Sequence, residues 1–242
     1  MSRTPAEAAD AVAEVFRDVF DQLAAWRAPI EQLLGSSGEI RPVILDTTVA
    51  DLVLPRLEEP DPMLVGAGFI ADGEVVRGKG VHFAWWLGPL ADNPVLGSTD
   101  GPTRLDLSTR GYTEYLRDFR ALEWYRIPAT TRHAHVTGPY VDHLCTCDYI
   151  LTLTMPVHDA DGERMVGVVG ADLAVRTLER ALLATFLEVD EPLALVNEHG
   201  RVVLSTEPAL QVGQLSGPGA ATVACAGTPF TVRVRPAASG SS

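Results

Sequence analysis

Three side chains in the middle of the sequence could bind a cationic ligand. Asp172 ends an apolar, strand-like segment, and Tyr140 and Asp142 stand two residues apart in a segment expected to be extended. Residues two apart on an extended chain project to the same side, so this hydroxyl and this carboxylate can face one pocket. The alternatives are purely structural roles. Asp172 could cap a helix, and Tyr140 and Asp142 could form a strand-edge hydrogen bond with the aspartate in solvent.

Aromatic residues that could wall such a pocket occur in two adjacent pairs, Trp85-Trp86 and Trp124-Tyr125. Aromatic faces attract ammonium groups through cation–π contacts. Neighbours on a strand point to opposite faces, so only one of Trp85 and Trp86 can enter a given pocket. Ordinary core packing is the alternative for both pairs. Glu123 would add negative charge to the pocket if it points inward.

Histidine and cysteine side chains form a second candidate site, this one for a metal ion. They are His133, His135, His143, Cys145 and Cys147. Their H-x-H and C-x-C spacings differ from the usual C-x2–4-C and H-x3–5-H spacings of structural zinc sites. A metal site therefore stays a weaker alternative.

No sequence pattern indicates an enzyme. The motifs G-x-S-x-G, H-E-x-x-H and the P-loop are absent. Cys145 lies two residues from His143, but no oxyanion-hole signature accompanies this pair. Cys225 falls in a strand pattern and is expected in the core. We expect no catalytic activity and no cofactor.

A long helix should organise the elements that carry these residues. Thr4-Pro5-Ala6-Glu7 has the form of a capping box with proline at the first helical position. Apolar residues then recur at intervals of three and four up to Gly35, which gives one helical stripe about 45 Å long. Such a helix could line two modules, or it could pair with a second copy in a homodimer.

The rest of the chain predicts short helices and antiparallel strands. A helix is expected over residues 43–57 and another over 111–120, with a loop over 88–102. Asp72-Gly73 and Asp161-Gly162 are hairpin signals. The strongest strands are 81–87, 149–157 and 165–173. A helix over 173–187 leads to strands at 193–196, 202–205, 221–226 and 230–234, with a turn at His199-Gly200.

This order of helices and strands predicts an α+β fold. Hairpins make antiparallel sheets, whereas the sheet of a doubly wound fold is mostly parallel. The expected parts are a helix over residues 1–35, a first module over 36–188, a second module over 189–236 and a frayed tail over 237–242.

Composition limits the partners. The 242 residues include 19 basic and 32 acidic ones, a net charge of −13. This charge repels nucleic acid and anionic membranes and attracts cations. No apolar run approaches the length of a membrane span and no secretory signal is visible. Three cysteines fit a reducing compartment. We expect a soluble, cytoplasmic protein without direct nucleic-acid or membrane contacts.

Three segments in order carry a family resemblance: EWYRIPA, GPYVDHL and YILTLTMPVHDADGERMVGVVGADL. They resemble the double Cache sensor domains, in which two PAS-like modules with antiparallel sheets share a long N-terminal helix. The later VNEHGRVVLST resembles the opening hairpin of that family's second module. The resemblance implies binding of a small solute in the first module, without catalysis, over roughly residues 5–235.

The resemblance also implies roles for single residues. Trp124, Tyr125, Tyr140 and Asp142 match family motif positions. Asp172 matches the aspartate that contacts the ligand amine in amino-acid-binding relatives. Those relatives place an arginine for the α-carboxylate where this chain has Leu122.

Leucine cannot pair with a carboxylate, and an unpaired buried carboxylate is costly. We therefore predict an amine or quaternary ammonium ligand that lacks an α-carboxylate. Arg117, Arg120 or Arg126 could replace the missing guanidinium, which keeps an amino-acid or carboxylate ligand open.

The signal of a free-standing domain would pass to a separate signalling or transcription-regulator protein. A vestigial module that only dimerises is the remaining alternative.

Overall fold

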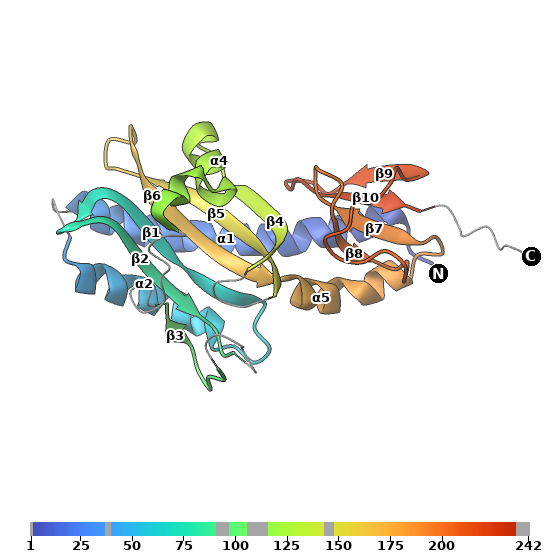
Figure 1. The fold of residues 1–242 in the computed structure, drawn as a ribbon, viewed down its shortest axis with the longest axis horizontal. Coiled ribbons are helices and arrows are strands. Elements are labelled where there is room, and N and C mark those ends of the chain that lie inside the picture. Colours follow the sequence, from blue (N-terminus) through green and yellow to red (C-terminus); the bar gives the residue numbers. More distant parts are fainter. Residues whose placement is uncertain (1, 37–39, 91–96, 106–115, 143–147, 236–242) are drawn as a thin grey trace, which may run out of the picture.

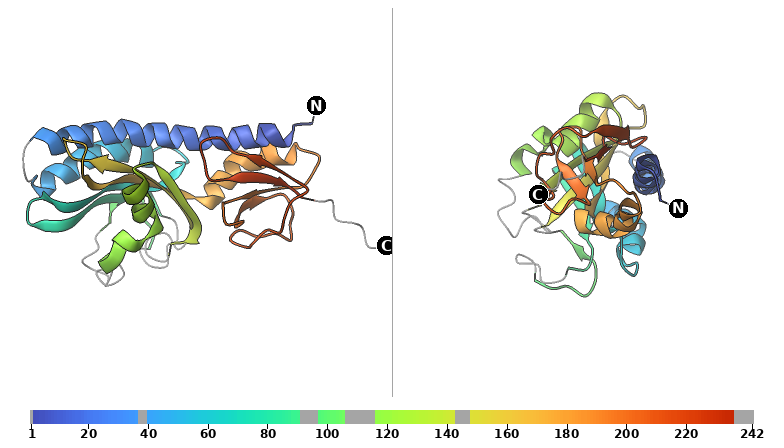
Figure 2. Two further views of the ribbon diagram at one scale, coloured as in Figure 1. Left: turned by 90° about the horizontal axis from the view of Figure 1, so that it is seen from above. Right: turned by 90° about the vertical axis from the view of Figure 1, so that its right-hand side faces the viewer.

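The computed structural model describes residues 2–36, 40–90, 97–105, 116–142 and 148–235. Its longest element is helix α1 (Pro5–Ser36), which runs beside both sheets of the molecule (Figures 1 and 2). The predicted capping box starts this helix. The Glu7 carboxylate accepts the Thr4 N–H at 2.7 Å, and Thr4 Oγ1 accepts the Glu7 N–H at 3.3 Å. The long helix and its first turn are thus confirmed.

The apolar stripe of α1 is buried within this chain. Its residues Val12, Phe16, Val19, Leu23, Trp26 and Ile30 all belong to the main hydrophobic core. The exposed side of α1 carries Asp10, Glu14, Asp18 and Asp21. A homodimer through this helix stays a prediction, and it would have to form on the charged side.

The first sheet has six antiparallel strands in the order β3-β2-β1-β6-β5-β4. The strands are β1 (Leu64–Val76), β2 (Lys79–Leu87), β3 (Thr103–Arg104), β4 (His135–Val141), β5 (Tyr149–His158) and β6 (Met165–Ala174). Helices α1 and α2 (Pro42–Leu57) cover one face (Figure 2). The other face carries the 3₁₀ helix η2 (Leu116–Ala121) and helix α4 (Glu123–Thr131).

The Asp72-Gly73 hairpin prediction is wrong. Strand β1 runs through this pair, and the chain turns instead at Arg77-Gly78. Gly73 has φ 77°, and the register with β2 shifts between Asp72 and Val76. The positive φ of Gly73 therefore belongs to an irregularity within β1, and one class of β-bulge uses a glycine with positive φ as tight turns do.

Two elements beside the cavity described below were not delimited from the sequence, although Tyr140 and Asp142 were expected in an extended segment. Helix α4 contains Pro128, which hid its periodicity. Strand β4 contains Gly138 and Pro139, which are typical of loops. Of the helix expected over residues 111–120, residues 111–115 lie outside the described part of the chain. The following residues form η2, which is 3₁₀ rather than α.

Helix α5 (Val175–Leu187) leads to the second sheet, whose order is β8-β7-β10-β9 (Figure 1). These strands are β7 (Leu193–Val196), β8 (Val202–Ser205), β9 (Ala221–Ala224) and β10 (Thr231–Val234). The expected turn at His199-Gly200 joins β7 to β8, with Gly200 at φ 77°. The α+β class with two antiparallel sheets is confirmed.

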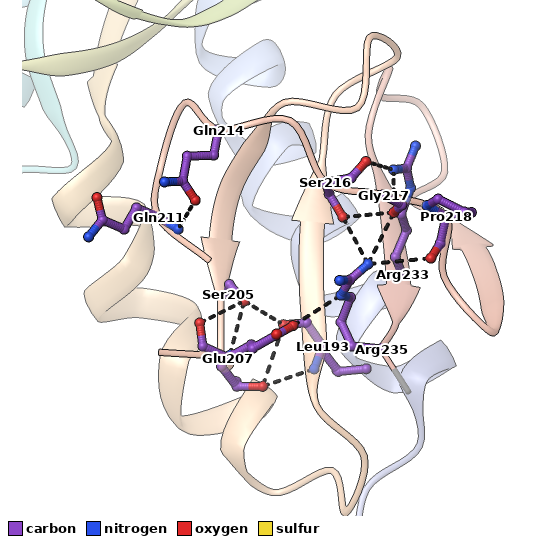
Figure 3. A network of polar contacts seen from close by, with 11 residues as sticks. Leu193, Ser205, Glu207, Gln211, Gln214, Ser216, Gly217, Pro218, Arg233 and Arg235 are labelled. Atoms are coloured by element: carbon purple, nitrogen blue, oxygen red, sulfur yellow. Dashed lines mark hydrogen bonds and ion pairs between the residues drawn. The ribbon is translucent and has the colours of Figure 1, made fainter. Parts of the chain in front are cut away.

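Two arginines on and after β10 anchor the long connection between β8 and β9 (Figure 3). Arg233 donates to the Ser216 carbonyl at 2.9 Å, and Arg235 donates to the Gly217 carbonyl at 3.1 Å. Arg235 also pairs with Glu207 at 3.1 Å. The guanidinium groups of both arginines therefore hold the backbone of the connection between β8 and β9.

Among the described residues, no helix combines the length and the apolar character that crossing a membrane requires.

Candidate functional site

A cavity of about 400 Å³ lies between the first sheet, the start of α4 and the β7–β8 turn. Six of the eight expected ligand-binding residues line it: Trp85, Glu123, Trp124, Tyr140, Asp142 and Asp172. Leu122 also lines it. The sheet register and α4 thus bring together residues that lie up to 87 positions apart in the sequence.

Glycines on β1 make room for the floor of this cavity. Gly66 pairs with Asp172 of β6, and Gly68 pairs with Trp85 of β2. A Cβ on Gly66 would lie 3.0 Å from Trp85 Nε1 and 3.2 Å from Asp172 Oδ2. The missing side chain therefore lets the indole and the carboxylate approach each other over β1.

Asp172 is a buried carboxylate with few partners. Thr152 Oγ1 donates to Asp172 Oδ1 at 2.6 Å, and it is the only hydrogen-bond donor to Asp172 among the described residues. The Tyr140 hydroxyl lies 2.6 Å from the same Thr152 oxygen. When Asp172 is ionised, the chain must run from Tyr140 to Thr152 to Asp172, because a carboxylate only accepts.

The electrostatics of this carboxylate are unusual. Burial and the negative charge of Asp142 raise the pKa of Asp172 to about 7, and the Thr152 hydrogen bond only partly offsets them. None of the ion pairs between described residues includes Asp172. The site therefore holds a carboxylate whose negative charge lacks a cationic partner.

Asp172 does not cap α5. The N-cap residue of this helix is Ala174, without a side-chain cap. The alternative role as a helix cap, left open by the sequence, is therefore wrong, and the carboxylate faces the cavity instead.

The first turn of α4 supplies the opposite wall. The Trp124 ring stacks on Phe119 with ring centres 6.1 Å apart. The backbone carbonyl of Trp124 accepts a hydrogen bond from the Thr154 hydroxyl at 2.7 Å. Glu123 lies 2.9 Å from His135 Nε2, and this hydrogen bond lowers the pKa of Glu123. The carboxylate of Glu123 is therefore stabilised by a hydrogen bond within the protein.

Tyr125 turns away from the cavity. Its hydroxyl donates to Asp72 Oδ2 at 2.5 Å, and Arg120 Nε donates to the same oxygen at 2.8 Å. Burial favours a higher pKa for Asp72, but the hydrogen bonds from Arg120 and Tyr125 outweigh it and the pKa lies below its usual value. Burial and the Asp72 charge raise the pKa of Tyr125. Tyr125 is therefore left out of the proposed site.

Trp86 is also left out of the proposed site. It lies in the main core on the opposite face of the sheet from Trp85. Alternation along β2 is the reason, and it leaves Trp85 as the indole over the cavity.

The arginines considered as substitutes do not line the cavity where they are described. Arg120 is held by Asp72, and Arg126 is exposed on α4. The side chain of Arg117 lies outside the described part. An arginine that the sequence did not suggest, Arg201, is exposed directly before β8 and lines the mouth of the cavity instead.

The metal candidates are not brought together in the described part of the chain. His135 lies beside Glu123, and His133 is exposed. His143, Cys145 and Cys147 lie outside the described residues. No group of three or more potential ligands occurs among the described ones.

Several cavity residues gave no sequence signal. They are Thr137, Thr152 and Thr154 from the first sheet and Asn197, His199 and Arg201 from the connection between β7 and β8. Threonine is common on strands whatever its role. The second sheet's contribution depends on how the two sheets pack, which no local pattern reports.

The contacts of Asp72 lead to a first prediction. The Asp72→Asn substitution should lower the free energy of unfolding by about 2–3 kcal/mol, because it breaks charged hydrogen bonds to a largely buried group. Urea unfolding at pH 7 measures this. Asp148→Asn, which loses a more exposed pair with Arg176, should change it by less than about 0.5 kcal/mol. Equal effects of the two variants would contradict this role for Asp72.

Residues 103–180 match the family model described as "Methyl-accepting chemotaxis protein-like, first PDC sensor domain". No curated protein matches the chain.

Solved structures with the same fold cover nearly the whole chain. The extracellular domain of a putative histidine kinase is 14% identical with TM-score 0.60, covering 95% of this chain and 91% of that domain. The ligand-binding domain of the Pseudomonas fluorescens chemoreceptor CtaA, in complex with L-valine, is 16% identical with TM-score 0.56, covering 96% and 94%. That of the Pseudomonas aeruginosa chemoreceptor PctC, in complex with GABA, is 17% identical with TM-score 0.54, covering 95% and 96%.

Proposed function

We propose that this chain is a double Cache sensor domain and that it binds a small ligand with a positively charged nitrogen. Its fold and the family match of residues 103–180 support the first part. The observation that carries the proposal is the buried carboxylate of Asp172, which faces a cavity and lacks a cationic partner among the described residues. A charge held in this way is unfavourable until a cation neutralises it.

The other walls fit the same ligand. Asp142 lies close enough to raise the pKa of Asp172, so two acidic groups act on one end of the cavity. Trp85 and Trp124 offer aromatic surface for a cation–π contact. Leu122 lines the cavity, and the double Cache resemblance implies an arginine at this position in amino-acid-binding relatives. The ammonium would lie at Asp172, with apolar parts of the ligand against the two indoles.

A zwitterionic amino acid is the second candidate, and Arg201 is the observation that favours it. One of its guanidinium nitrogens donates to the Gly213 carbonyl at 3.0 Å, while the residue lines the cavity mouth. A ligand long enough to reach from Asp172 to this mouth could present a carboxylate there. Two of the similar structures hold amino acids, L-valine and GABA.

A thermal-shift and calorimetry panel tests the proposal. It contains alkylamines, tetramethylammonium, amino acids and simple carboxylates. A ligand present at 100 times its Kd stabilises the fold by about 2.7 kcal/mol. We expect stabilisation by amines. Stabilisation by carboxylates alone would contradict the proposal. Arg201→Gln should weaken amino acids and leave amines unchanged, which separates the two candidates.

The cytoplasmic location, the homodimer and the separate signalling partner stay predictions.

A further inference from the structure

Thr137 carries a buried hydroxyl at the proposed ligand site that no described residue satisfies. The residue is 8% exposed and lines the cavity, and its Oγ1 has no hydrogen-bond partner among the described residues. Arg56 Nε is the only other side-chain atom of this kind in the described part of the chain. Buried hydroxyls are normally paired, so each exception calls for an explanation.

The neighbouring threonines show the contrast. Thr152 donates to Asp172, and Thr154 donates to the Trp124 carbonyl. All three lie on strands β4 and β5 and line the same cavity. Protein groups satisfy two of these hydroxyls, while no group in the described part of the chain satisfies the third.

The sheet register relates Thr137 to the proposed ammonium site. Thr137 pairs with Thr152, and Thr152 pairs with Asp172, so the three residues form one row across β4, β5 and β6. Two strand spacings separate the ends of this row, roughly 10 Å. A ligand whose ammonium lies at Asp172 could therefore extend along the row to Thr137.

The backbone at Thr137 is held in place. Asn197 Nδ2 of the second sheet donates to the carbonyl of the next residue, Gly138, at 2.8 Å. The β4–β5 register shifts immediately after Thr137. Because the backbone is held, the Thr137 hydroxyl changes its hydrogen-bond partner only by rotation about the Cα–Cβ bond. This rotation exchanges the hydroxyl with the methyl group.

We propose that Thr137 is a ligand-binding residue whose hydroxyl donates to an oxygen atom of the ligand. This inference rests on the proposed function and narrows it. The ligand is an ammonium compound that also carries a hydroxyl, carbonyl or ether oxygen, several bonds from its nitrogen. An O–H group needs an acceptor, and the described protein residues provide none here.

Matched pairs of probes test this inference. Amino alcohols with two to five carbons between nitrogen and oxygen are each compared with the alkylamine of equal heavy-atom count. Calorimetry measures Kd for the wild type and for Thr137→Val, which keeps the shape and removes the hydroxyl. We expect the wild type to prefer at least one amino alcohol by about 3- to 10-fold. In Thr137→Val this preference should vanish, while the Kd of the alkylamine stays within twofold.

Thr154→Val is the matched control. Its hydroxyl already has a protein partner, so its loss should lower Tm and weaken both members of a pair equally. Thr137→Val should not lower Tm, because the substitution removes no hydrogen bond between described residues.

The outcomes separate this inference from the proposed function. An unchanged preference in Thr137→Val overturns the role of Thr137 and leaves the ammonium proposal intact. The pair 4-hydroxybutyrate and pentanoate is measured in the same way. If this pair binds with a preference that depends on Thr137 while amines fail, the ammonium proposal falls and Thr137 remains a ligand contact. If neither series binds, both are overturned.

Discussion

Asp172→Asn should weaken the binding of an ammonium ligand by about 100-fold or more. The substitution keeps the size of the side chain and removes the charge that faces the cavity. Losing one partner of a buried, hydrogen-bonded charge pair typically costs about 2–5 kcal/mol. Isothermal titration at pH 8 with an amine that stabilises the wild type measures the change. An affinity within threefold of the wild type would refute the assignment.

The same variant should be more stable than the wild type when no ligand is present. The pKa of Asp172 is about 7 in the folded protein, against an ordinary value of 3.8. The folded state therefore binds the proton more tightly than the unfolded state does. Above pH 7 the ionised group destabilises the fold by up to about 4 kcal/mol, and this penalty declines as pH falls below 7.

Unfolding at two pH values tests this sign. Asp172→Asn should exceed the wild type in stability at pH 8, and the difference should be much smaller at pH 5. Asp46→Asn serves as the control, because Asp46 pairs with His82 and Arg104 outside the cavity. This control should lose stability without losing the ligand. A loss of both in Asp172→Asn would indicate a structural role instead.

Ligand affinity should fall as the solution becomes acidic. An ammonium group needs the ionised form of Asp172, and its pKa is about 7 in the unliganded protein. Below that pH the apparent Kd should rise about tenfold per pH unit, so binding at pH 5 is about 100-fold weaker than at pH 8. Tetramethylammonium is a suitable probe, because its own charge does not titrate.

Titrations in buffers of different ionisation enthalpy should show about one proton released per ligand bound at pH 6. Asp142, Glu123, Glu198, His199 and Arg201 also line the cavity. The Asp172→Asn variant separates the contribution of Asp172 to the pH dependence from that of these neighbours. It should show a nearly flat affinity between pH 5 and 8 for any ligand that it still binds. A flat profile in the wild type would contradict the assigned role of Asp172.

Much of the fold could be predicted from the sequence. The stripe and capping box of α1, the strands around Asp161-Gly162 and the hairpin at His199-Gly200 follow from local periodicity and turn chemistry. The order of the motifs between residues 123 and 173 indicated the double Cache resemblance. The family model and the similar structures support it. Asp72-Gly73 misled the prediction because a glycine with positive φ occurs in one class of β-bulge as well as in hairpin turns.

The candidate site was only partly predictable. Asp172, Asp142 and Tyr140 could be grouped because motif order and alternation along strands place them on one face. Which of two adjacent aromatic residues enters the cavity could not be read in advance. Trp85 faces it while Trp86 packs in the core, and Trp124 faces it while Tyr125 binds an aspartate 53 positions earlier.

The sequence by itself determined most of the helices and strands, the acidic character of the site and the presence of a leucine at position 122, because residue type and local spacing act within one segment. Tertiary structure alone decided which hydroxyls are satisfied, how Arg120 and Tyr125 are occupied, and that Arg201 reaches the cavity. These depend on strand register and on the packing of two sheets. Both are set by contacts between segments far apart in the chain.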